Sequence, residues 1–125
     1  MANYVLEETK NSPAISFDFS KGLLEIKGFS VPENSFEFYE PLMKAINDYS
    51  SSPSPETTIN LFLHYFNTSS SKCILGILKE FSKIHQQGTS VKVNWFYEED
   101  DDDMLEAGTD YSSLVDIPFK VVQKN

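Results

Sequence analysis

Four consecutive hydroxyl side chains, Thr68 to Ser71, follow Asn67 where a strand-like apolar run gives way to a helical pattern. One capping oxygen is enough to begin a helix, because it accepts a hydrogen bond from a free amide of the first turn. Capping by Asn67 or Thr68 therefore leaves other hydroxyls unexplained. The free amides and the positive end of the helix dipole also favour a phosphate, so the segment suits phosphorylation on an exposed loop before the helix. It lacks the glycine-rich pattern and Gly-Lys-Ser/Thr ending of a nucleotide-binding loop.

A second unusual segment is the run of six carboxylates from Glu98 to Asp103. Three interpretations are open: a solvated charged loop, a divalent-metal site, and an electrostatic docking surface for a basic partner. The patterned glycine and distal glutamate of an EF-hand loop are absent, which argues against the metal site. Asp102 or Asp103 is expected to cap the following helix, because carboxylates stabilise the amino-terminal end of a helix.

The remaining reactive side chains are two histidines and one cysteine. His64 falls on a predicted strand and His85 near the end of a predicted helix, and neither has a zinc-ligand partner at the usual spacing. Cys73 falls in the first turn of a helix, where a thiolate is favoured, but no general base can be assigned to it. We therefore expect no metal centre, no nucleophilic triad and no cofactor.

Alternating apolar residues predict the strands that position these segments. A hairpin is expected over Ile15–Lys27, with a tight turn at Ser20-Lys21-Gly22. Thr57–Phe66 is almost continuously β-branched, apolar or aromatic, which predicts a central strand covered on both faces. Two further strands are expected at Val91–Tyr97 and Phe119–Val122.

Apolar residues at helical spacing predict three helices. Asn34 and Ser35 are candidate caps for the first, but Pro41 is unfavourable inside a helix, so the helix proper is expected to begin near Tyr39. Gly88 is expected to close the second helix. The expected ranges are about 39–50, 72–87 and 104–114.

The order of these elements, β-β-α-β-α-β-α-β, predicts a single α/β domain over residues 1–125 with a mixed sheet. Strands separated by helices pair in parallel through right-handed crossovers. The carboxyl ends of parallel strands share one edge of the sheet, where functional loops gather. We therefore expect the hydroxyl-rich segment Asn67–Ser71 and the acidic segment Glu98–Asp103 to be neighbours at that edge.

Composition narrows the class of partner. The formal net charge is −9 and the ten basic residues are scattered, which argues against binding to nucleic acid or to an anionic membrane. A single cysteine excludes an intramolecular disulfide. The sequence shows no signal peptide and no transmembrane segment, so a cytoplasmic location is expected.

Both unusual segments carry a family resemblance. The stretches Tyr65–Lys72 and Glu99–Gly108, together with the region from Pro32 to Pro41, resemble the SiaC-type regulatory phosphoproteins of bacteria. The likeness extends from about Ala14 to Val122. It implies a fold similar to the anti-anti-sigma-factor (STAS) domain, which agrees with the predicted order of elements.

The resemblance also implies a function. Members of this family are non-enzymatic switch proteins of partner-switching pathways, phosphorylated on a threonine by a dedicated kinase and reset by a PP2C-type phosphatase. The unphosphorylated form promotes a diguanylate cyclase, which links the family to cyclic di-GMP and biofilm control. The phosphorylated threonine corresponds to Thr68 of this chain. The side chains expected to contact partners are Asn67, Ser69, Ser70, Ser71, Lys72, Asp100, Asp101, Asp102 and Asp103.

Two alternatives stay open from the residues alone. One is a small divalent-metal-dependent enzyme that uses the acidic segment, with Asp101 and Asp103 as ligands. The other is a constitutive assembly subunit that is never modified. The absence of a general base and of a His/Cys cluster weighs against the enzyme.

Overall fold

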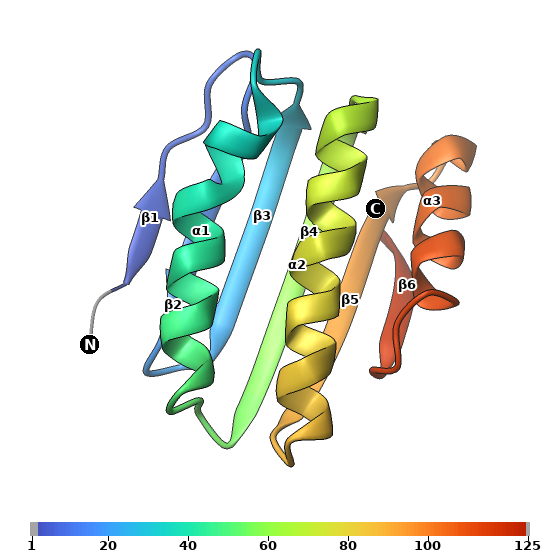
Figure 1. Ribbon diagram of the computed structural model, residues 1–125. Helices are drawn as coiled ribbons and strands as arrows, with labels where there is room; N and C mark the ends of the chain where they lie inside the picture. Colours follow the sequence, from blue (N-terminus) through green and yellow to red (C-terminus); the bar gives the residue numbers. More distant parts are fainter. Residues whose placement is uncertain (1–2, 125) are drawn as a thin grey trace.

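The structure is a computed structural model that describes residues 3–124. Its six strands form one sheet in the order β1-β2-β3-β4-β5-β6. Strands β1, β2 and β3 pair antiparallel, and β3, β4, β5 and β6 pair in parallel (Figure 1). The elements are β1 (Tyr4–Leu6), β2 (Ala14–Asp18), β3 (Leu23–Ser30), α1 (Ser35–Ser50), β4 (Glu56–Phe66), α2 (Thr68–Gln86), β5 (Ser90–Glu98), α3 (Asp102–Ser112) and β6 (Phe119–Lys124). The predicted mixed α/β sheet is confirmed, with β1 as an additional short edge strand that periodicity did not predict.

The helices cover one face of the sheet. Along β4 the side chains on the helix side are buried, whereas those between them, such as Asn60 and Phe62, are only half-buried. The prediction that β4 is covered on both faces is therefore wrong. The run looked continuous because aromatic side chains also lie on the open face, where Phe62 contacts His64 and Phe96 rather than a covering helix. Among the described residues, no helix is long and apolar enough to cross a membrane.

Helix α1 begins four residues earlier than predicted, at Ser35. The Asn34 side chain caps it by accepting a hydrogen bond from the Glu37 amide at 3.1 Å. Pro41 therefore lies inside the helix, where it removes one backbone donor. Its own side chain is exposed, and burial of the opposite face of α1 offsets the lost bond.

Helix α2 also begins earlier than predicted, at Thr68 instead of Lys72. The hydroxyl-rich segment is therefore the first turn of the helix and not a loop before it. The apolar stripe of α2 begins only after the hydroxyls, so periodicity placed the start of the helix at Lys72. The helix in fact begins directly after its capping residue, Asn67. Gly88 follows the carboxyl end of α2 with a positive φ of 109°, as predicted for a closing glycine.

Helix α3 is held against β5 by two contacts with Trp95. The indole Nε1 donates a hydrogen bond to the Met104 carbonyl at 2.9 Å. Gly108 lies so close to the indole that a β-carbon there would be 2.4 Å from Trp95 Cδ1. A glycine at this position lets the helix approach the sheet directly.

We predict that Gly108→Ala destabilises the fold by about 1–3 kcal/mol, since the added methyl group must displace α3 or the indole. Gly76→Ala is the matched control, because a β-carbon at Gly76 in α2 would meet nothing within 4 Å. The control should gain roughly 0.5–1 kcal/mol from helix propensity. Urea denaturation followed by Trp95 fluorescence measures both changes, and equal effects of the two variants would contradict the close packing.

Candidate phosphorylation site

Asn67 fixes the first turn of α2. Its Oδ1 accepts hydrogen bonds from the Ser70 amide at 2.9 Å and from the Ser69 hydroxyl at 3.2 Å. The backbone amide of Asn67 donates a hydrogen bond to the Ser30 carbonyl at 3.0 Å, which joins the start of the helix to the end of β3. Asn67, one of the two predicted caps, is thus the cap, and Thr68 is the first residue of the helix.

Ser70 is fully buried and belongs to a network of hydroxyls. Its Oγ lies 2.8 Å from that of Ser30 and 3.1 Å from that of Ser35, the first residue of α1. Ser30 also contacts the Tyr39 hydroxyl at 2.6 Å, and Ser35 contacts Ser69 at 2.8 Å. Burial raises the pKa of Tyr39 to about 12, although its hydrogen bond with Ser30 opposes the shift. The phenol therefore stays neutral within the network at neutral pH.

Ser71 connects α2 to α3. The Tyr111 hydroxyl donates to the Ser71 carbonyl at 3.0 Å and lies 2.9 Å from its Oγ. Burial raises the pKa of Tyr111, against a smaller opposing contribution from this contact. The first turn of α2 is thereby joined to the last turn of α3.

Thr68 differs from the three serines that follow it. Its side chain is exposed, whereas Ser70 is buried and Ser69 and Ser71 are half-buried. Within residues 3–124, its hydroxyl makes no hydrogen bond, whereas each serine hydroxyl has an internal partner. Lys72, one helical turn further on, is also exposed. Thr68 is therefore the hydroxyl of this segment that is free for chemistry at the surface.

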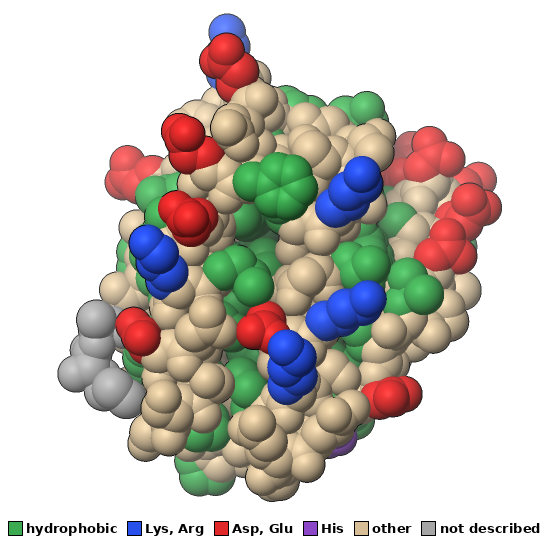
Figure 2. All heavy atoms as spheres, in the orientation of Figure 1, with side chains coloured by type: hydrophobic (Ala, Val, Ile, Leu, Met, Phe, Trp, Pro, Cys, Tyr) green, Lys and Arg blue, Asp and Glu red, His purple; other side chains and the backbone are tan. Residues whose placement is uncertain are grey.

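The acidic segment lies at the same edge of the sheet as the start of α2, as predicted (Figure 1). Carboxylates gather over α3 and the turn before it, at the right of Figure 2. Asp100, Asp102 and Asp103 are exposed. In the described part of the chain, no hydrogen bond or ion pair joins Thr68 to these carboxylates, and Tyr111 makes the connection between the two helices instead.

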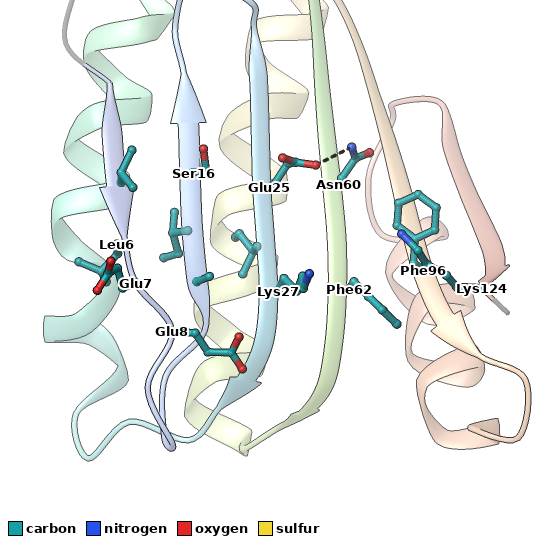
Figure 3. Close-up of a pocket in the computed structure, with 14 residues that line it drawn as sticks. Leu6, Glu7, Glu8, Ser16, Glu25, Lys27, Asn60, Phe62, Phe96 and Lys124 are labelled. Atoms are coloured by element: carbon teal, nitrogen blue, oxygen red, sulfur yellow. Dashed lines mark hydrogen bonds between the residues drawn. The ribbon is translucent and has the colours of Figure 1, made fainter.

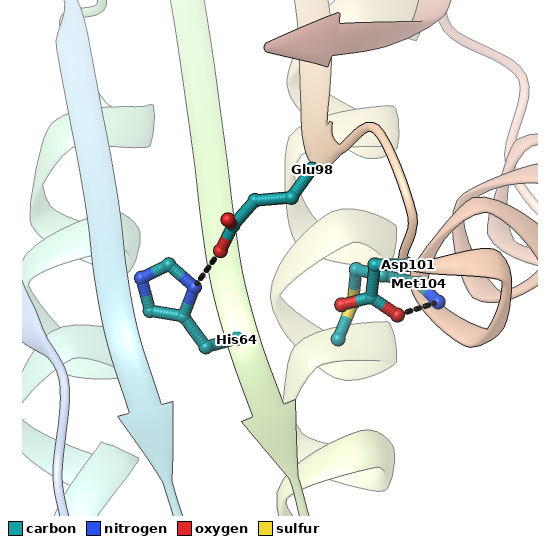
Figure 4. Close-up of polar contacts among 4 residues, drawn as sticks. All are labelled: His64, Glu98, Asp101 and Met104. Carbon is teal, nitrogen blue, oxygen red and sulfur yellow. Dashed lines mark hydrogen bonds and ion pairs between the residues drawn. The ribbon is translucent and has the colours of Figure 1, made fainter. Parts of the chain in front are cut away.

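The cap of α3 is Asp101, not the predicted Asp102 or Asp103. Its Oδ1 accepts a hydrogen bond from the Met104 amide at 3.0 Å (Figure 4). A turn in which the Asp101 amide donates to the Glu98 carbonyl at 3.0 Å places this side chain before the helix. Asp102 and Asp103 then occupy the first turn, where the helix dipole favours their charge.

The histidines have polar partners, and the cysteine packs against the core. His64 Nδ1 lies 2.9 Å from Glu98 Oε1 across the open face, as Figure 4 shows. His85 Nδ1 accepts a hydrogen bond from the Val91 amide at 3.2 Å, at the turn after α2. Cys73 is half-buried, and burial raises the pKa of its thiol, which opposes the thiolate. Among residues 3–124, no group of three or more His, Cys, Asp or Glu side chains is placed to hold a metal ion.

Four residues were not assigned to this site from the sequence: Ser30, Ser35, Tyr39 and Tyr111. Ser30, Ser35 and Tyr111 contact the hydroxyl segment from at least 32 positions away along the chain. Tyr39 reaches it through Ser30. Serine at the end of a strand and tyrosine at a core position of a helix carry no distinctive signal. Only the long-range contact reveals their role.

A family model described as the SiaC family of regulatory phosphoproteins matches residues 6–124. The chain belongs to this family. The resemblance seen in the two unusual segments is thus confirmed over almost the whole chain.

The fold also matches solved SiaC structures from Pseudomonas aeruginosa. Apo-SiaC superposes with a TM-score of 0.88 at 27% identity, covering 99% of this chain and 100% of that one. SiaC in complex with the diguanylate cyclase SiaD, which it activates, superposes with a TM-score of 0.91 at 27% identity. The match covers 97% of this chain and 99% of that one. An uncharacterized protein of strain UCBPP-PA14 of the same species is 28% identical over 121 residues, covering 97% of this chain and 96% of its own length.

We predict that Ser70→Ala lowers the free energy of unfolding by about 1–2 kcal/mol, because Ser30 and Ser35 each lose a buried hydroxyl partner. Ser69→Ala should cost less, since water can replace a half-exposed hydroxyl. Urea denaturation of both variants measures the difference. A larger loss for Ser69→Ala would show that the buried network does not hold this end of α2.

Proposed function

We propose that this protein is a phosphorylation-controlled activator of a diguanylate cyclase, with Thr68 as the phosphorylated residue. The observation that carries the proposal is the exposure of Thr68 beside three serines whose hydroxyls are used internally. Membership of a family of regulatory phosphoproteins supports the modification, and the activation of SiaD by SiaC supports the output. In this proposal a dedicated kinase adds the phosphate and a PP2C-type phosphatase removes it.

The unphosphorylated protein docks on the cyclase through the first turn of α2 and the adjoining acidic edge. Lys72 and the carboxylates Asp100, Asp102 and Asp103 are exposed there and available to a partner. Asn67, Ser69, Ser70 and Ser71 contribute by fixing the shape of the turn. Asp101 holds α3 in place as its cap.

A phosphate on Thr68 prevents docking by charge and by bulk. It adds about −1.5 to −2 charges at neutral pH, at an edge that already carries several carboxylates. The buried network beneath Thr68 does not include its hydroxyl, so the modification leaves the fold of α2 intact. The switch therefore acts on the surface that the partner meets.

The first test is mass spectrometry of the protein isolated from its native host. We expect one phosphate, mapped to Thr68 and absent from Thr68→Ala. A phosphate found on Ser69 or Ser71 instead would overturn the assignment, because those hydroxyls have internal partners.

The second test measures cyclic di-GMP in host cells and cyclase binding by the purified protein. Thr68→Ala should bind the cyclase constitutively and raise cyclic di-GMP, whereas the phosphorylated wild type should bind at least about tenfold more weakly, a loss of about 1.4 kcal/mol. Thr109→Ala is the control, because it removes another exposed threonine hydroxyl, and it should remain switchable. If Thr68→Ala binds no better than the phosphorylated protein, the mechanism is wrong.

A further inference from the structure

The face of the sheet that carries no helix is hollowed (Figure 3). The hollow measures about 650 Å³, within the range of ligand sites, and side chains from all six strands line it. None of its lining residues belongs to the hydroxyl or acidic segments, because those lie at the edge of the sheet. The open face is therefore a second surface, on the side of the sheet away from α2 and Thr68. It borders the acidic segment at the end of β5, where Glu98 contacts His64 and pairs in register with Lys124.

Two aromatic rings form a platform in the hollow. Phe62 on β4 and Phe96 on β5 lie with ring centroids 6.5 Å apart. The ammonium of Lys124 is placed 4.7 Å from the Phe96 centroid and 5.4 Å from the Phe62 centroid, as the close approach of Lys124 to Phe96 in Figure 3 shows. Cations are attracted to the faces of aromatic rings at such distances. The platform thus already holds a cation supplied by the chain itself.

Carboxylates line the rest of the hollow, with Glu25 on β3, one strand from Phe62, and Glu7 and Glu8 after β1 toward the opposite edge of the sheet. The Glu25 carboxylate accepts one hydrogen bond, from the Asn60 amide at 3.4 Å, and the Glu8 carboxylate lies against Gly28 (Figure 3). Neither Glu25 nor Glu8 forms an ion pair within the described chain. With Glu7, the lining has three carboxylates against two ammonium groups, those of Lys27 and Lys124. The protein as a whole has a net charge of −9. This balance favours a cationic ligand and opposes a phosphate.

We propose that the open face binds a basic segment of a partner protein. A lysine or arginine side chain of the segment replaces Lys124 over Phe62 and Phe96, and a neighbouring cation pairs with Glu25. Arginine is especially suited, because its planar guanidinium both stacks on rings and binds carboxylates through two donors. Lys124 is exposed and lies near the end of β6, so it can leave the rings without disturbing the core.

The test uses a hexa-arginine peptide as the probe, titrated into isotope-labelled full-length protein at low salt and followed by amide NMR shifts. We expect shifts on β3, β4 and β5 around Phe62 and Phe96, and none with hexa-glutamate. Lys124→Ala should tighten binding about two- to fivefold, since it removes the internal competitor. Glu25→Gln should weaken binding.

Asp103→Asn is the matched control, because it removes one exposed carboxylate at the other surface. It should leave the peptide affinity nearly unchanged. Equal weakening by Asp103→Asn and Glu25→Gln would mean general attraction to an acidic protein, and shifts centred on α3 would place the peptide at the acidic segment. Either result, or a Lys124→Ala variant that binds no tighter, overturns the proposal. Because the Lys124 side chain is exposed, Lys124→Ala is expected to fold like the wild type, so its affinity reports on binding alone.

Discussion

The hydrogen bonds around Ser70 are the constraint on which the arrangement of this end of the molecule depends. Three elements meet there: Ser30 ends β3, Ser35 begins α1, and Ser70 lies in the first turn of α2. Apolar packing alone tolerates small rotations of a helix, whereas a buried hydroxyl must find its partner or remain unsatisfied. The network therefore fixes the rotation of α2 about its axis. Because Thr68 comes two residues before Ser70, that rotation decides whether its hydroxyl points to solvent.

Helix α3 is fixed in place by the same core that positions α2. The rings of Trp95 on β5 and Tyr111 on α3 lie with their centroids 5.2 Å apart. This aromatic contact joins the short helix α3 to the core on which α2 also packs. Asp102 and Asp103 are then carried on a capped, packed helix, and the carboxylates before them lie in the short turn that the Asp101 cap closes. Fixed charges at a defined edge can discriminate between partners, which a mobile acidic tail does far less well.

Periodicity predicted the elements of this chain well where one pattern dominated. The hairpin, the parallel order and the shared edge of the two unusual segments follow from alternation and connection rules alone. The errors arose where a cap fixed the start of a helix. At Asn34 the cap outweighed Pro41, which had moved the predicted start of α1 to Tyr39. At Asn67 the cap begins α2 before its apolar stripe. The aromatic residues of β4 misled for a different reason: Phe62 is paired with Phe96 and Lys124 on an open face, and sequence alone does not distinguish that from burial by a helix.

The separation of the two surfaces bears on how a switch of this kind can work. If a phosphate on Thr68 acted by reshaping the fold, the buried hydroxyls beneath it would have to break, and each broken contact would leave an unsatisfied polar group in the core. A change of charge at an exposed position requires no such rearrangement and is reversed completely when the phosphate leaves. The rigid network thus favours a switch by surface electrostatics over one by conformational change. It also leaves the open face of the sheet, on the far side of the core, unaltered by the modification.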